Sequence, residues 1–217
     1  MGLLVRELGV CTYAAALAVQ EDLVAAKIAG QGEDVLLLLE HEPVYTLGRG
    51  ADVHDVLDAD RRLGVPLFRV SRGGGATFHG PGQLVAYPIV TLAHAGRDVH
   101  RYVRRLEHVL IGVCADFGIS AAPRPGLTGV WVAEKKIASI GVGVRRWTTF
   151  HGIALNVSTD LRCFSYIVPC RMPDVRMTSM TAELGAAPAM SDVRASFVRR
   201  FRAVFGYAAA DPESCHP

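Results

Sequence analysis

The chain has 217 residues, half of them hydrophobic, which is enough for one large domain, expected over residues 1–210 with a flexible tail over 211–217. Its formal net charge of +2 gives no global reason to expect nucleic acid as a partner. No stretch resembles a secretory leader or a membrane span, and the five cysteines are an odd number, so we expect a cytoplasmic protein without membrane association or a disulfide framework.

The first half of the chain predicts one helix and three strands. A helix is expected over Tyr13–Gly30, because apolar residues recur at helical spacing and glycines follow as a stop. The continuously apolar run Asp34–Glu40 indicates a strand buried on both faces, although periodicity alone leaves a helix open. After a loop opened by His41-Glu42-Pro43, runs at Leu67–Val70 and Leu84–Val90 predict two strands joined by a glycine-rich loop.

The second half predicts two amphipathic helices around a strand meander. A helix over about Asp98–Phe117 has one apolar and one basic face. After a turn at Ala122–Gly126, three antiparallel strands are expected at Val130–Ala133, Lys136–Val144 and Trp147–Val157. A last helix is expected over Ser191–Phe205, with Ser191 or Asp192 as its cap.

The segment Arg72–Gln83 holds five glycines and a proline, more than a strand connection needs for turning alone. Glycines leave backbone N–H groups open to a ligand, which favours a binding loop over a tight hairpin with unusual backbone angles. Gly80 is followed by Pro81 rather than by lysine, and a strand rather than a helix is expected next. The segment therefore predicts a ligand site but disfavours ATP and NAD.

Cys170 and Lys136 are candidates for a nucleophilic site, because a thiol needs a nearby cation or donor to ionise at neutral pH. Simple alternation along the strand places Lys136, Ala138 and Ile140 on one face and Ile137, Ser139 and Gly141 on the other. Spacing alone favours the simpler interpretation, in which Lys136 is solvated at a strand end and Cys170 is a small buried hydrophobe.

Two histidines offer another way to activate a thiol. His79 and His151 are each followed by glycine, where a backbone can approach a substrate closely. A lone histidine is more often structural, so both interpretations stay open. Cysteine and histidine pairs at metal-binding spacing are missing from the sequence, so no metal site is expected.

Six separated segments between about positions 5 and 205 match one family pattern. They are His41–Gly48, Arg72–Gln83, Lys136–Val142, His151–Val157, Ile167–Cys170 and Thr178–Ser179. On these segments the chain resembles the lipoyl (octanoyl) transferases, which move an octanoyl group from acyl carrier protein to lipoyl domains. The resemblance implies an α/β fold like that of lipoate and biotin protein ligases, a mixed sheet flanked by helices, without metal, nucleotide or other cofactor.

The resemblance also implies roles for individual residues. Cys170 takes the acyl group as a thioester, Lys136 lowers the pKa of the thiol, and His79 assists by orienting groups or moving protons. Contacts with the acyl group are expected from Arg72, Gly73, Gly74, Gly75, Ala76, Thr77, Phe78, His79, Ser139, Ile140, Gly141, Gly152, Ile153 and Ala154. Arg171 stands where the family usually has glycine, so the chain departs from the pattern beside its nucleophile.

The implied partners are octanoyl-acyl carrier protein as donor, and as acceptors the lipoyl domains of 2-oxoacid dehydrogenase complexes and the H protein of glycine cleavage. Arginines on the last two predicted helices are candidates for docking the acidic carrier, although an ordinary solvated face is the simpler interpretation. Three alternative functions remain: an ATP-dependent lipoate ligase, a Cys–His thioesterase and a non-catalytic acyl-binding protein. Octanoyl transfer to an acceptor lysine without nucleotide separates the transferase from all three.

Overall fold

The computed structural model describes residues 2–56, 64–92, 96–168 and 175–208. Within these residues the main sheet has eight strands. In spatial order they are β1 (Leu3–Cys11), β2 (Asp34–His41), β6 (Gln83–Ile89), β10 (Thr148–Asn156), β9 (Lys135–Arg145), β8 (Leu127–Val132) and β7 (Ala122–Arg124), while β11 (Arg176–Met177) pairs with β9. A second sheet has the order β4 (Leu67–Arg69), β3 (Val44–Leu47) and β5 (Ala76–His79).

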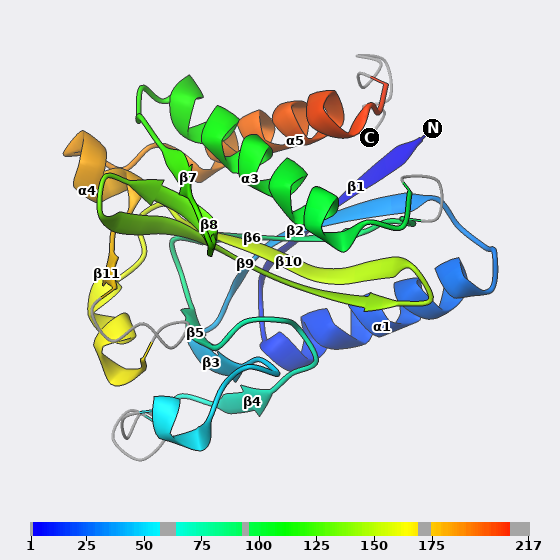
Figure 1. Cartoon of the computed structure of the whole chain (residues 1–217), viewed down its shortest axis with the longest axis horizontal. Coiled ribbons are helices and arrows are strands. Elements are labelled where there is room, and N and C mark those ends of the chain that lie inside the picture. The colour runs from blue at the N-terminus through cyan, green and yellow to red at the C-terminus, as the bar shows by residue number, and fades with distance from the viewer. Residues whose placement is uncertain (1, 57–63, 93–95, 169–174, 209–217) are drawn as a thin grey trace.

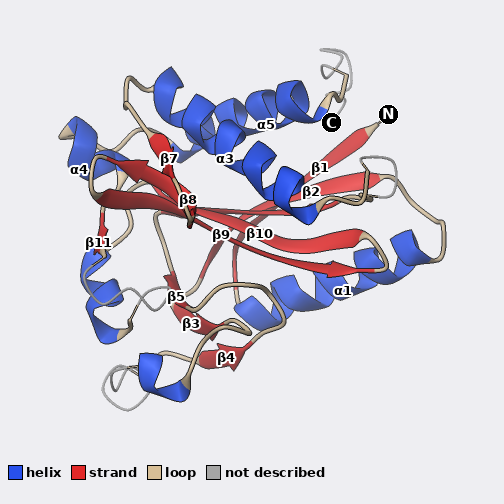
Figure 2. Ribbon diagram, in the orientation of Figure 1, coloured by secondary structure: helices blue, strands red, loops and turns tan. Residues whose placement is uncertain are grey.

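Helices cover both faces of the main sheet (Figures 1 and 2). Helices α3 (Val99–Asp116) and α5 (Met190–Phe205) pack side by side over one face, and α1 (Tyr13–Ile28) covers the other. The remaining helical segments are η1 (Val53–Asp55), η3 (Leu161–Tyr166) and α4 (Met180–Leu184). The second sheet lies on the same side of the main sheet as α1 (Figure 1). None of the helices in the described part of the chain is both long and apolar enough to cross a membrane.

Strand β2 shows why the sheet is covered on both faces. Leu36 and Leu38 enter the core beneath α3 and α5, whereas Leu37 and Leu39 enter the core beneath α1. All four leucines are fully buried, because successive side chains of a strand point to opposite faces. The prediction of a strand buried on both faces is confirmed.

The predicted long helices are confirmed, and their ends follow capping chemistry in two of three cases. Thr12 accepts a hydrogen bond from the Ala15 amide at the start of α1, and Asp98 accepts one from the Arg101 amide at the start of α3. The predicted cap of the last helix is wrong. Helix α5 begins one residue earlier, after Ala189, which makes no side-chain cap, so Ser191 and Asp192 lie inside its first turn.

The predicted antiparallel meander is confirmed as β8, β9 and β10. The structure corrects three other expectations. Residues 122–124 of the expected turn form β7, the segment after His41-Glu42-Pro43 contains β3, and the middle of the glycine-rich segment forms β5. These short strands offer too few residues for a periodic pattern, and pairing with distant partners stabilises them. The predicted tail over 211–217 lies outside the described residues.

Candidate active site

A pocket lies on the α1 side of the main sheet, where the second sheet meets β6, β9 and β10. It is lined by Tyr13, Arg72, Gly74, Ala76, Thr77, His79, Tyr87, Ser139, Ile140, Gly141, His151, Gly152, Ile153 and Ala154. Most of the predicted acyl-contact residues are therefore gathered in one place, while Gly73, Gly75 and Phe78 do not line the pocket. Their contact with an acyl group stays a prediction.

The glycine-rich segment comes close to the sheet because β9 carries glycine at the point of contact. Gly141 of β9 pairs with Gly152 of β10, and the Gly73 amide donates to the Val142 carbonyl at 2.9 Å. A Cβ at Gly141 would lie 2.9 Å from Cδ of Arg72 and 3.0 Å from the Gly73 carbonyl oxygen. Glycine at 141 is thus required for the segment to close over the pocket.

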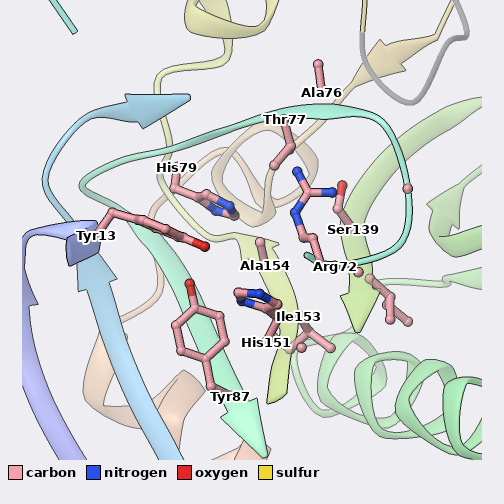
Figure 3. Close-up of a pocket in the computed structure, with 14 residues that line it drawn as sticks. Tyr13, Arg72, Ala76, Thr77, His79, Tyr87, Ser139, His151, Ile153 and Ala154 are labelled. Carbon is pink, nitrogen blue, oxygen red and sulfur yellow. The ribbon is translucent and has the colours of Figure 1, made fainter. Parts of the chain in front are cut away.

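Arg72 brings a buried positive charge to the rim of the pocket. Its guanidinium donates to the carbonyl and Oγ1 of Thr46 at 3.0 and 2.7 Å, and to the Gly73 carbonyl at 3.0 Å. These bonds hold the guanidinium in place, across from the rings of Tyr13 and Tyr87 (Figure 3). Arg72 is the charged side chain among the pocket-lining residues that the structure describes.

Three buried histidines near the pocket are held in the neutral form. Burial lowers the pKa of His41 and of His151 to about 4, and burial together with nearby His41 and Arg72 holds the pKa of His79 well below its usual range. Nδ1 of His41 donates to the Cys11 carbonyl, so its Nε2 accepts from the Tyr87 hydroxyl at 2.7 Å. At neutral pH these rings can orient polar groups and accept protons, and in their resting form they add no charge to the pocket.

His151 is held in an unusual backbone conformation. Its φ of 54° lies in the left-handed region, although it is inside β10. The pairing of β10 with β6 begins only at Ile153, so the His151 amide donates instead to Oε1 of Gln20 on α1 at 2.8 Å. Nε2 of His151 is buried without a hydrogen-bond partner among the described residues. Strain held by neighbouring structure is common at functional sites, which fits a histidine that lines the pocket.

Lys136 is not where simple alternation places it. Val130 pairs with Ala138 and Trp131 with Lys136, so Ile137 is an extra residue that makes a β-bulge in β9. The bulge turns Lys136 to the face of Trp131, where its Nζ lies 5.4 Å from the ring centroid. The expected sharing of a face with Ala138 is wrong, because Ala138 enters the core beneath α3 and α5.

Burial also contradicts the simpler interpretation of Lys136 as a solvated residue. Only 2% of Lys136 is exposed. Ala138, beyond the bulge, faces the α3 side, so the bulge gives Lys136 the same side as Ser139, which lines the pocket. Lys136 itself is not among the residues that line the pocket.

Cys170 and Arg171 lie outside the described residues. The described chain stops at Val168 and resumes at Val175, and Met177 of β11 then pairs with Lys136. The Thr178 amide donates to the Lys136 carbonyl at 2.9 Å. The chain that follows the predicted nucleophile therefore lies beside the predicted lysine.

The described cysteines are poor nucleophiles. Burial raises the pKa of Cys114 to about 12, and it also raises the pKa of Cys11 and of Cys163. Within the described residues no group of three or more His, Cys, Asp or Glu is gathered where it could hold a metal.

Sequence reasoning missed three residues around the pocket. Tyr13 and Tyr87 line it, and His41 lies behind Tyr87. Figure 3 shows the hydroxyl ends of the two tyrosines converging with His79 and His151. A tyrosine within an otherwise aliphatic buried strand was the available signal for Tyr87, and the His41–Gly48 motif was the signal for His41.

Comparison with known proteins agrees with this geometry. A family model described as the lipoyl protein ligase A/B catalytic domain matches residues 12–202. Octanoyltransferases of Geobacter metallireducens and Geobacter sp. (strain M21) are 50% and 51% identical over 199 and 197 residues. The alignments cover 92% and 91% of this chain and 92% and 94% of those proteins.

Solved structures share the fold at low sequence identity. A bi-partite lipoate protein ligase from Thermoplasma acidophilum has a TM-score of 0.73 at 21% identity, covering 96% of this chain and 85% of that one. A biotin protein ligase from Aquifex aeolicus has a TM-score of 0.53 at 12% identity, covering 95% of this chain and 69% of that one. The predicted ligase-like mixed sheet flanked by helices is confirmed.

Proposed function

The chain belongs to the lipoyl protein ligase A/B catalytic-domain family, and within this family we propose that it is an octanoyltransferase of lipoate biosynthesis. The observation that carries the proposal is 50% identity with an octanoyltransferase over 92% of both chains. The pocket supports it, since segments that match the family pattern meet there. The ATP-dependent ligases share the fold alone at 21% identity or below, so the fold does not favour them over the transferase.

The transfer proceeds in two steps that need no nucleotide. The Cys170 thiolate attacks the carbonyl carbon of the octanoyl thioester, a new thioester forms on Cys170, and the donor thiol leaves with a proton. An acceptor lysine amine then attacks that thioester, an amide forms, and the Cys170 sulfur is released. Lys136 stabilises the thiolate and exchanges protons, a role supported by its burial and by the pairing of β11 beside it.

The acyl chain occupies the pocket described above. Isoleucine, alanine and glycine surfaces from β9 and β10 line it, and the histidines nearby are neutral. Each methylene of the chain changes binding by only about 1 kcal/mol, so the pocket discriminates modestly between neighbouring chain lengths. The side chains of Arg72 and neutral His79 are polar groups at the rim of the pocket, and both orient the thioester.

The partners follow from the chemistry of the reaction. The donor is an acyl thioester and the acceptor is a lysine on a lipoyl domain; an archaeal relative is described together with its E2 lipoyl domain. We further propose octanoyl-acyl carrier protein as donor, and both dehydrogenase lipoyl domains and glycine-cleavage H protein as acceptors. The choice of these donors and acceptors does not depend on the arginines of α3 and α5.

Mass spectrometry of the intact protein tests the mechanism. Wild-type protein incubated with octanoyl-acyl carrier protein is expected to gain one octanoyl group, and to lose it when a lipoyl domain is added without ATP. Cys170→Ser is expected to gain none, and Lys136→Ala to acylate about 100-fold more slowly. Lys135→Ala is the matched control, because this neighbouring lysine is 40% exposed and pairs with Glu183.

Each alternative function gives a different result in the same experiment. Release of free octanoate identifies a thioesterase, and a requirement for ATP identifies a ligase. Stable acylation without transfer identifies an acyl-binding protein. Transfer by Cys170→Ser at the wild-type rate would refute the thioester mechanism.

A further inference from the structure

A line of buried hydrogen bonds connects His79 to the strand of Lys136. Nδ1 of His79 lies 2.8 Å from Oε1 of Gln83, and Nε2 of Gln83 lies 2.9 Å from Oδ1 of Asn156. Nδ2 of Asn156 donates to the Thr178 carbonyl at 3.0 Å, and the Thr178 amide donates to the Lys136 carbonyl at 2.9 Å. All five residues are at least nine-tenths buried. The line therefore spans the interior between two predicted catalytic residues.

Each side-chain hydrogen bond in this line has one possible direction, which the backbone carbonyl of Thr178 sets. The Thr178 carbonyl can only accept, so Asn156 must present its NH₂ there and its Oδ1 to Gln83. Gln83 must then present its NH₂ to Asn156, where it also reaches the Phe78 carbonyl at 3.2 Å. Its Oε1 is left facing Nδ1 of His79, and an oxygen there requires Nδ1 to carry the proton.

With the proton on Nδ1, Nε2 of His79 carries none. The ring is neutral because burial holds its pKa well below the usual range, so only one ring nitrogen is protonated. Nε2 lies 3.5 Å from Oγ1 of Thr46, at the pocket that His79 lines (Figure 3). Nε2 of His79 is thus a hydrogen-bond acceptor, facing the Thr46 hydroxyl, rather than a donor.

Asn156 also stabilises the position of β11. Asn156 is the last residue of β10 and pairs with Gln83 at the start of β6. From there its NH₂ holds the Thr178 carbonyl, directly after β11, whose Met177 is in register with Lys136. One side chain therefore holds both the ring on the β5 side of the pocket and the strand next to the lysine.

We propose that Asn156 is a positioning residue for octanoyl transfer, which fixes His79 as the Nδ1–H tautomer through Gln83 and fixes β11 beside Lys136 through the Thr178 carbonyl. The kinetic part of this inference rests on the proposed function. The tautomer is a property of the folded chain and is measured without any substrate.

Nitrogen-15 NMR of labelled histidine, combined with steady-state kinetics, tests the inference. In the wild-type protein His79 is expected to show a protonated Nδ1 and a bare Nε2 between pH 6 and 8. Asn156→Ala removes the shorter of the two hydrogen bonds that orient the Gln83 amide and leaves only the one to the Phe78 carbonyl at 3.2 Å, so a mixture of tautomers is expected. Its kcat for octanoyl transfer is expected to fall about 10- to 100-fold, as for residues that orient metal-binding histidines, with KM for the donor nearly unchanged.

Ser196→Ala is the control, because it removes the hydrogen bond of another buried polar side chain, from Oγ to the partly exposed Asp116, on the far side of the sheet. It is expected to lower Tm without changing the tautomer or kcat. A wild-type His79 protonated on Nε2 would overturn the inference, and this measurement needs no variant. The inference also fails if Asn156→Ala, or Gln83→Leu should that variant not fold, lowers Tm alone. A wild-type protein without transferase activity would refute the proposed function and leave the tautomer test valid.

Discussion

At the scale of single residues, burial decides the charge of the site. His41 and His151 are almost completely buried, and each keeps a pKa of about 4 because the charged ring would lose its water without gaining an acidic partner. Arg72 keeps its charge since carbonyl and hydroxyl oxygens surround the guanidinium. The pocket thus combines one fixed cation with neutral rings.

The buried histidines predict an acid-sensitive fold. Between about pH 6.5 and 4 the unfolded chain binds protons at His41 and His151 that the folded chain does not. The free energy of unfolding is therefore expected to fall as the pH is lowered through this window, by roughly 2 kcal/mol per histidine at pH 5. Urea denaturation at pH 7.5 and pH 5 measures this change.

His41→Asn provides the variant and His54→Asn the control for the acid effect. His54 is 92% exposed, so its replacement should leave the difference between the two pH values as in wild type. His41→Asn should reduce that difference. An equal difference in all three proteins would contradict the assignment of acid sensitivity to buried rings.

At the scale of elements, local irregularities decide which side chains meet. The bulge at Ile137 moves Lys136 from the α3 side to the pocket side of β9. Glycine at 141 lets the glycine-rich segment reach β9 and close the pocket, and glycine at 152 lets β10 lie close to the Ala86 carbonyl of β6. On the other face Asp116 of α3 accepts hydrogen bonds from Ser196, Arg199 and Arg200 of α5. The two helices are thereby connected at one end.

Asp116→Asn is expected to weaken the contact between α3 and α5. Hydrogen bonds from Arg200, Ser196 and Arg199 hold the pKa of Asp116 well below its usual range, so the carboxylate stabilises the fold at neutral pH. Its neutral replacement should lower Tm by about 2 to 4 °C for each kcal/mol lost. Calorimetry measures the shift. Glu134→Gln, which breaks an exposed pair with Arg124, should leave Tm unchanged, and an equal shift in both variants would argue against a special role for Asp116.

At the scale of the whole molecule, the sheet separates the pocket from the basic helices. The pocket is on the α1 side, whereas α3 and α5 lie on the opposite face (Figure 1). Several of their arginines are also engaged within the fold. Arg105 donates to the Val204 carbonyl and stacks on Phe205, and Arg194 pairs with Glu7 and Glu40. These contacts favour a structural role for the basic faces over docking of a carrier.

The variant Arg101→Glu tests that interpretation. Arg101 is exposed on α3, so the fold should tolerate the change. KM for octanoyl-acyl carrier protein is expected to stay within about twofold of wild type at both low and high salt, because the donor must reach the other face of the sheet. A large, salt-dependent rise in KM would show that the carrier docks on α3.

Elements with a local pattern, and the motifs that define the family, could be predicted from the amino-acid sequence alone. The leucine run of β2 and the apolar faces of α1 and α3 predict their own structure, since each needs only periodicity and a core to face. Six separated segments in one chain, Arg72–Gln83 and His151–Val157 among them, match the family pattern, and this resemblance indicated the chemistry. Single-domain organisation and the role of Cys170 remain predictions.

The way in which the predicted residues meet depends on contacts between segments that are far apart in the sequence. The face of Lys136 depends on a bulge that exists only when β9 pairs with β8. Tyr13 and Tyr87 reach one pocket from α1 and β6, and the amides of Gln83 and Asn156 meet across 73 positions of sequence. Pairing register and side-chain hydrogen bonds between distant segments carry no local periodicity, so they could be recognised only once the strands were placed together.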